Sequence, residues 1–205
     1  MALLLGLLVA VPTRADPAIE ALLARLARPA PAKTLFVEVR FSDLLSEPLV
    51  SRGELSFEAA DRLGKRVDTP FQETTSVHGE NVRIERSGRK PMQFNLKRAP
   101  ELRALLAGFS GLLGGDRAAL QRYFSIKVMG SDARWQIELA PRAARMRKRV
   151  AGVTVFGAEN AARCFSIDQG EGDASVMLVD EAARGPLPQP LTLSALLALC
   201  RGEPG

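Results

Sequence analysis

Residues 34–59 read TLFVEVRFSDLLSEPLVSRGELSFEA, and this stretch predicts the first hairpin of an antiparallel sheet. Apolar and polar side chains alternate over residues 35–41, which is the period of a strand that buries one face. Further along, Leu55 and Phe57 share one face, while the acidic and hydroxyl side chains around them share the other. Pro48 lies in the gap between the two segments, where we expect the chain to turn.

Short strand-like segments of this kind continue through most of the chain, each bounded by turn residues. Further strands are expected at residues 63–70, 71–79, 80–88, 91–96, 123–130, 133–139, 152–157, 164–168 and 174–180. Helical spacing or capping residues predict helices at residues 16–28, 100–113, 117–123, 141–150 and 192–200. The sequence therefore predicts an α+β fold that is mainly β, with an antiparallel sheet and helices available to cover one face.

The N-terminus predicts export. Residues 1–15 read MALLLGLLVAVPTRA, with a short apolar core and small residues before Ala15, so we expect a signal peptide cleaved near Ala15. A buried N-terminal helix is the alternative. The apolar run is too short to span a membrane as a stable anchor, and residues 16–205 are expected to form one domain.

The chain has two cysteines, Cys164 and Cys200. In an oxidising compartment two cysteines most simply form one disulfide, which would attach the C-terminal segment to the body of the protein. Two buried thiols are the alternative reading. Two cysteines and a single histidine, His78, are too few for a cysteine-rich zinc cluster or a site with two histidines.

The motifs of common enzymes are absent from the sequence. It contains no G-x-S-x-G elbow and no phosphate-binding Walker loop. The acidic residues at 168–173 suggest either a calcium site or, more simply, a polar hairpin tip. We therefore predict a protein that is not an enzyme and has no cofactor and no metal site.

The charge and composition leave the partner open. The formal net charge is +5, which suits either a solvated basic surface or contact with anionic lipids or an acidic partner. Aromatic residues make up only 5% of the chain, which argues against stacking of single-stranded nucleic acid. No nucleic-acid partner is predicted.

The helix expected at residues 100–113, PELRALLAGFSGLL, carries six large apolar side chains and little charge. Such a helix could plug the mouth of an incomplete barrel and enclose a cavity for an apolar ligand. Ordinary packing of the helix into a core is the simpler alternative.

Several residues in order along the chain resemble the LolA family, the periplasmic carriers of outer membrane lipoproteins. The matching features are Phe36-x-Glu38, Gly53-x-Leu55-x-Phe57, Pro70, His78-Gly79, Tyr123 and the stretch Trp135–Pro141. The resemblance covers residues 18–179 and rests on order and spacing. It identifies the chain as a divergent LolA-like member.

The resemblance implies an incomplete antiparallel barrel, or strongly curved sheet, with a helical lid over its concave face. Acyl chains would bind between sheet and lid, against the following residues: Phe36, Leu55, Phe57, Leu63, Leu102, Leu105, Leu106 and Phe109. It further implies a monomer in the periplasm that receives lipoproteins from an inner-membrane donor complex and passes them to an outer-membrane acceptor. A lipid-sensing or regulatory module of the same fold, acting on a membrane-protein partner, is the alternative function.

The sequence departs from the family pattern at positions that matter for the lid. Family members carry an Arg-Pro pair whose arginine hydrogen-bonds to the lid, and Ala59 and Ala60 stand there instead. Lys65 replaces a family aromatic residue. Glu38 and Arg40 lie two residues apart on one strand face, where they would contact a polar head group or form an outward surface pair.

Overall fold

The computed structural model describes residues 17–203. The predicted signal peptide at residues 1–15 lies outside these residues. Within residues 17–203 no helix is long and apolar enough to cross a membrane.

The strands form one antiparallel sheet of eleven members. They are β1 (Ala32–Phe41), β2 (Leu49–Ala59), β3 (Arg62–Thr69), β4 (Glu73–His78), β5 (Asn81–Arg86), β6 (Met92–Asn95), β7 (Phe124–Ser131), β8 (Arg134–Pro141), β9 (Gly152–Ala158), β10 (Ala161–Gly170) and β11 (Asp173–Val179). Their order in the sheet is β6-β5-β4-β3-β2-β1-β11-β10-β9-β8-β7. Two meanders, β1–β6 and β7–β11, thus join through the antiparallel pair of β1 and β11, in which Phe36 lies opposite Val179.

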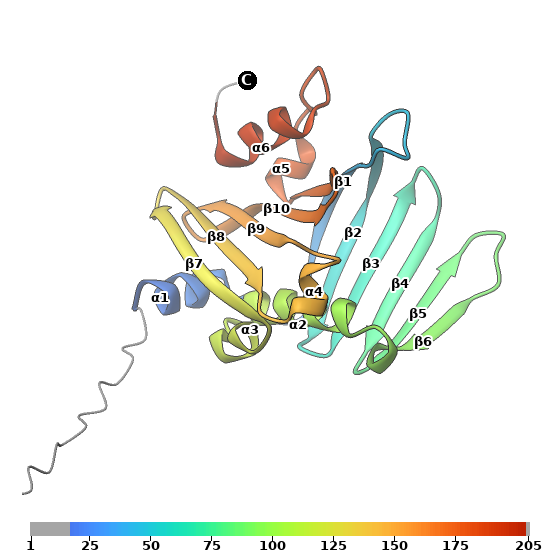
Figure 1. Cartoon of the computed structure of the whole chain (residues 1–205), viewed down its shortest axis with the longest axis horizontal. Coiled ribbons are helices and arrows are strands. Elements are labelled where there is room, and N and C mark those ends of the chain that lie inside the picture. The colour runs from blue at the N-terminus through green and yellow to red at the C-terminus, as the bar shows by residue number, and fades with distance from the viewer. Residues whose placement is uncertain (1–16, 204–205) are drawn as a thin grey trace, which may run out of the picture.

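The sheet is curled but not closed, because its edge strands β6 and β7 do not pair with each other. Figure 1 shows the two meanders leaning toward one another, with the helices placed on both sides. The predicted fold class is therefore confirmed: a mainly β protein whose antiparallel sheet is curved and open, with a helical lid.

Helices fill the connections and the ends of the chain. They are α1 (Pro17–Leu26), the 3-10 helix η1 (Leu96–Arg98), α2 (Pro100–Gly114), α3 (Arg117–Tyr123), α4 (Ala144–Arg147), α5 (Glu181–Arg184) and α6 (Leu193–Arg201). The two edge strands are consecutive in the chain, so η1, α2 and α3 form the connection between them. Figure 1 shows α2 crossing from the β6 side toward α3 beside β7.

Because strand side chains alternate between faces, the sheet has two separate cores. The concave core lies under α1–α4 and includes Leu23, Phe36, Leu120, Ile137 and Val155. The outer core lies under α5 and α6 and includes Val39, Leu178 and Leu196. Burying each such side chain contributes roughly 1.5–3 kcal/mol, so both sets of helices are held mainly by apolar packing.

Gly157 of β9 lets a tryptophan lie across the concave face. A Cβ atom at Gly157 would lie 2.1 Å from the Trp135 ring, which is too close for any other residue. The indole Nε1 donates a hydrogen bond to the carbonyl oxygen of Glu159 at 3.1 Å. The missing side chain at Gly157 thus makes room for the ring of Trp135, the residue opposite it on β8.

On the outer face, a disulfide joins Cys164 of β10 to Cys200 of α6. Both cysteines are buried within the outer core. The sequence left open whether the two cysteines form a disulfide or remain buried thiols, and in the structure they form a disulfide.

The structure differs from the sequence prediction in α4, in α5 and in the 3-10 helix η1, which was not predicted. The basic segment 141–150 was expected to be helical throughout, but only one turn, α4, forms. Pro141 still pairs with Phe124 at the end of β8, so the helix starts later. The short helix α5 was not predicted, because four residues carry too little periodicity to identify.

Candidate functional site

The candidate site lies between α2 and the β1–β6 half of the concave face. Pro100 occupies the first turn of α2, where its fixed φ suits a helix start. The N-cap residue, Ala99, makes no side-chain capping hydrogen bond, and Gly115 ends the helix in the left-handed conformation with a φ of 68°. The helix sets its small residues against its neighbours. A Cβ atom added at Gly108 would meet the Phe124 ring, and one at Gly111 would meet Leu120.

This packing leaves four large apolar side chains of α2 on another side of the helix, where they are only half-buried, whereas Leu112 is buried in the concave core. The four are Leu102, Leu105, Leu106 and Phe109. Leu105 and Phe109 contact the concave core, and the Phe109 ring lies 5.1 Å from that of Phe165 on β10. Leu102 and Leu106 contact a smaller cluster around Val77 and Val82.

The sheet offers a matching half-buried apolar surface below α2. Leu55 contacts the concave core, while Leu63 contacts the smaller cluster. Phe57 lies opposite Leu63 and is buried. Phe36 is only 1% exposed, so a ligand would reach its ring only after neighbouring side chains move. Seven of the eight predicted lipid contacts thus lie in two apolar clusters between sheet and helix, which we call the apolar layer, and Phe57 lies opposite one of them, Leu63.

Sequence reasoning missed other apolar residues of this layer. Phe71, Ile84, Phe94, Phe165 and Met177 pack in the same clusters. Ile84 and Phe94 alternate with polar neighbours on short strands, and this alternation was the available signal.

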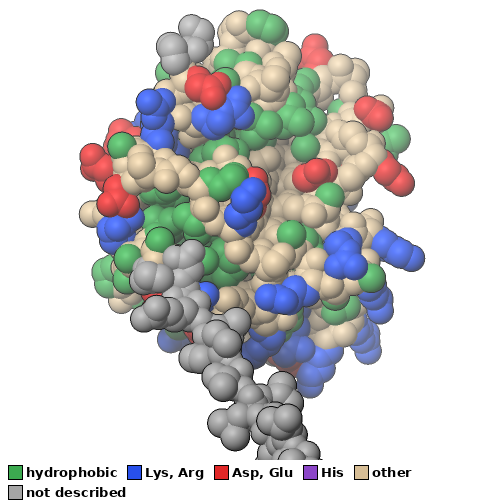
Figure 2. Space-filling view, turned by 60° about the vertical axis from the view of Figure 1, so that its left-hand side comes forward, with side chains coloured by type: hydrophobic (Ala, Val, Ile, Leu, Met, Phe, Trp, Pro, Cys, Tyr) green, Lys and Arg blue, Asp and Glu red, His purple; other side chains and the backbone are tan. Residues whose placement is uncertain are grey.

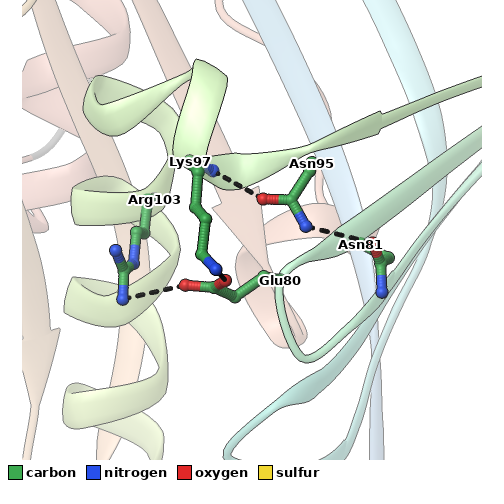
Figure 3. Close-up of polar contacts among 5 residues, drawn as sticks. All are labelled: Glu80, Asn81, Asn95, Lys97 and Arg103. Atoms are coloured by element: carbon green, nitrogen blue, oxygen red, sulfur yellow. Dashed lines mark hydrogen bonds and ion pairs between the residues drawn. The ribbon is translucent and has the colours of Figure 1, made fainter.

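Polar contacts fasten the N-terminal part of α2 to the turn between β4 and β5. Glu80 accepts ion pairs from Arg103 of α2 at 3.0 Å and from Lys97 of η1 at 3.3 Å. Asn95 accepts a hydrogen bond from the backbone N–H of Lys97 and donates one to Asn81. Figure 3 shows these side chains converging at the turn. The start of the lid is therefore held by exposed, charge-based contacts.

Two further contacts hold α2 along its length. Glu101 accepts an ion pair from Arg145 of α4 at 3.0 Å. The Ser110 hydroxyl donates a hydrogen bond to the carbonyl oxygen of Ala60 at 2.8 Å. The backbone of Ala60 thus gives α2 a contact with the turn that follows β2.

Replacing Glu80 with Gln is expected to loosen α2. The variant loses two exposed ion pairs, each contributing about 0.5 kcal/mol, so amide hydrogens of residues 100–114 should exchange roughly fivefold faster. Hydrogen–deuterium exchange with mass spectrometry measures this change. Glu85→Gln is the matched control, since it removes an exposed pair with Arg83. Unchanged protection of α2, or equal loosening in the control, would contradict the tether.

A charged pair lies inside the apolar layer. Glu38 accepts a hydrogen bond from the Lys65 ammonium at 2.5 Å, and the Glu38 side chain is 13% exposed. The Lys65 Nζ atom lies 5.0 Å from the centre of the Phe36 ring, within cation–π range. Glu38 thus pairs with Lys65, while Arg40 is exposed. Glu38 therefore has Lys65 and not Arg40 as its ion-pair partner, and contact of Glu38 and Arg40 with a polar head group stays a prediction.

A second group of the same type was not predicted. Glu73 and Arg86 lie opposite each other on β4 and β5 and form an ion pair at 2.6 Å. The Arg86 guanidinium also lies 4.2 Å from the centre of the Phe71 ring. The same arrangement, a carboxylate paired with a cation that also lies over an aromatic ring, therefore occurs at two places in the structure.

Arginine side chains lower the pKa of two carboxyl groups on the surface. A hydrogen bond from Arg83 lowers the pKa of Glu85, and one from Arg201 lowers the pKa of Glu203. Both carboxylates are exposed and lie outside the apolar layer. Residues 17–203 contain no cluster of three or more histidine, cysteine, aspartate or glutamate side chains suited to a metal ion. In the 168–173 hairpin, Asp168 instead accepts the backbone N–H of Gly170.

Comparison with known proteins identifies the family of the chain. The family model described as outer membrane lipoprotein carrier protein LolA-like matches residues 10–203. The sequence matches none of the curated proteins with which it was compared.

Solved structures resemble the chain at low sequence identity. A LolA superfamily protein, NE2245 from Nitrosomonas europaea, is 10% identical with a TM-score of 0.45, over 85% of this chain and 96% of that one. A domain named as a putative outer membrane lipoprotein-sorting protein, from Vibrio parahaemolyticus, is 8% identical with a TM-score of 0.41, over 90% of this chain and 97% of that one. LprF from Mycobacterium bovis is 10% identical with a TM-score of 0.36, over 85% and 98%.

Proposed function

Because the chain belongs to the LolA-like family of outer membrane lipoprotein carrier proteins, we propose that it carries acyl chains between the inner and outer membranes. The cargo is a lipoprotein or another lipid whose saturated chains bind between α2 and the sheet. The protein works by binding and release, without making or breaking a covalent bond.

The observation that carries this proposal is the arrangement of side chains on α2. A helix that served only as core would bury all of its large apolar residues, as α2 does with Leu112. Here Gly108 and Gly111 occupy the closest contacts, while Leu106 and Phe109 stay half-buried over the sheet. Each methylene group of a ligand buried there contributes about 0.8 kcal/mol, so an acyl chain has a favourable place to insert once α2 moves.

The tethers of α2 suit a lid that must open and close. The contacts Glu80–Arg103 and Ser110–Ala60 are single, exposed and polar, and each contributes only about 1 kcal/mol or less. Such contacts hide the apolar layer from water when no cargo is bound, yet their total is small enough for cargo to displace.

The disulfide and the family support a periplasmic location, since disulfides persist in oxidising compartments. In this proposal residues 1–15 are a signal peptide, and residues 16–205 form one carrier domain that works as a monomer. An inner-membrane donor complex loads it, and an outer-membrane acceptor unloads it.

The tethers also favour a second candidate. A lid held at three places could stay closed over an empty layer, and the protein would then act as a lipid-sensing or regulatory module on a membrane-protein partner. Capture of such a partner by a protein that binds no lipid would favour this function.

Binding of an acyl probe tests the carrier proposal. We expect the purified protein to bind a fluorescent fatty acid saturably, and palmitate to displace it. Mass spectrometry of an organic extract of the native protein should find co-purified lipid. No probe binding together with no extracted lipid would refute the carrier function.

A further inference from the structure

The segment around α4 concentrates positive charge beside the lid. It reads RAARMRKR over residues 142–149. We define the α4 basic patch as its five cations together with Arg122 at the end of α3: Arg122, Arg142, Arg145, Arg147, Lys148 and Arg149, all of which are exposed. The backbone N–H of Arg142 donates to the carbonyl oxygen of Tyr123, which brings the end of α3 next to this segment.

Most of this charge is not neutralised within the protein. Among residues 17–203, Arg145 alone of the six has a carboxylate within ion-pair distance, that of Glu101. Arg142 donates instead to the carbonyl oxygen of Phe124, and Arg147 donates to those of Pro141 and Arg142. Carbonyl oxygens hold these guanidinium groups in place but leave their full charge exposed.

The patch is rigidly mounted. Met146 and Val150 are buried in the concave core, so they anchor the segment from below and direct the charged side chains outward.

In the view that brings the β7 side of the sheet forward, Lys and Arg side chains gather toward the lower right of the surface, and hydrophobic side chains form separate patches elsewhere (Figure 2).

These observations point to a lipid surface. We propose that the α4 basic patch docks the protein onto anionic phospholipid headgroups of a bilayer. A protein interface normally has an apolar or aromatic centre, whereas the exposed part of residues 142–149 contains only arginine, lysine and alanine. An anionic bilayer needs only a density of cations.

The position of the patch gives docking a purpose. The Arg145–Glu101 pair connects α4 to the first turn of α2, so a bilayer bound at the patch lies beside the lid. Docking at this place is useful if the protein carries lipid as proposed, because cargo must then pass between the apolar layer under α2 and a membrane. To this extent the inference rests on the proposed function. Its test does not require acyl binding.

Vesicle sedimentation tests the docking surface. The purified protein is mixed with sucrose-loaded vesicles of phosphatidylcholine alone, or of phosphatidylcholine with phosphatidylglycerol, whose anionic headgroups give the surface a negative potential. We expect it to pellet only with the anionic vesicles and to be released at high salt. The patch variant Arg122→Gln, Lys148→Gln, Arg149→Gln should bind roughly 100-fold more weakly, since each cation contributes about a fivefold factor.

The matched control is Arg52→Gln, Arg89→Gln, Lys90→Gln, which removes the same charge from exposed cations on β2 and the β5–β6 turn. It should bind anionic vesicles nearly as the parent chain does. Three results would each overturn the proposal: no pelleting with anionic vesicles, as expected if the patch serves an acidic protein; equal binding to neutral vesicles; or equal loss in the control. Unaltered acyl-probe binding by the patch variant keeps this test separate from that of the carrier function.

Discussion

Replacing Leu106 with Glu is expected to weaken binding of the acyl probe at least 30-fold. Leu106 lies on the half-buried face of α2 and packs against the cluster that contains Val77 and Val82. A bound chain would have to desolvate the new carboxylate, and it would lose contact with the leucine. The two costs together reach about 2 kcal/mol or more. Fluorescence titration of the probe measures the change.

Leu35→Glu is the control for this variant. Leu35 lies on the outer face of β1 and is 45% exposed, so the same substitution there should leave the probe affinity within about twofold, as surface changes usually do. Leu106→Trp is a second variant that separates lost binding from lost folding. It keeps the side chain apolar but fills the space that an acyl chain would occupy. It should exclude long saturated chains more than short ones. If Leu106→Glu binds the probe as well as Leu35→Glu does, the acyl chain does not lie under α2.

Removing the disulfide is expected to cause the largest loss of stability. The bond between Cys164 and Cys200 closes a loop with a sequence separation of 36. In the chain-entropy view this stabilises the folded state by about 4 kcal/mol. The double variant Cys164→Ala, Cys200→Ala should therefore unfold roughly 8–16 °C lower than the parent chain, and calorimetry or circular dichroism measures the midpoint.

The same variant separates stability from binding. The disulfide fastens α6 to the outer face, while α2 covers the concave face, so probe binding below the unfolding transition should be nearly unchanged. Reducing the parent chain with dithiothreitol should reproduce the lowered midpoint. A shift of less than about 3 °C in both experiments would show that apolar packing around Leu196 already fixes α6.

Local features of the fold could be predicted from the sequence because their causes are local. The helix α3 has the predicted limits, since Asp116 caps it by accepting the N–H of Ala119. The alternation around Phe36 likewise identified β1. The pair of β1 and β11 could not be predicted, because Phe36 and Val179 are far apart in the chain and no turn sets their register.

The candidate site was predictable in its apolar part only. Spacing along residues 100–113 predicted a helix with six large apolar side chains, and the resemblance to the LolA family selected four of them as lid residues. Those four, Leu102, Leu105, Leu106 and Phe109, are half-buried in the structure. The partner of Glu38 was not predictable. Lys65 is two strands away and reaches Glu38 across Gly53, which has no side chain in that row of the sheet. Such a diagonal contact depends on how the three strands are aligned with one another and on whether a side chain of the middle strand stands in the way.

The topology of the sheet also has a kinetic consequence. In the part of the chain that the structure describes, every strand pair except one joins strands that are neighbours in sequence, and the exception is β1 with β11. Hairpins close quickly because their loops are short, whereas joining distant segments carries a larger loop-closure cost. We therefore expect the two meanders to form early and their seam at β1–β11 to close last, so that the concave surface is assembled in the final step of folding.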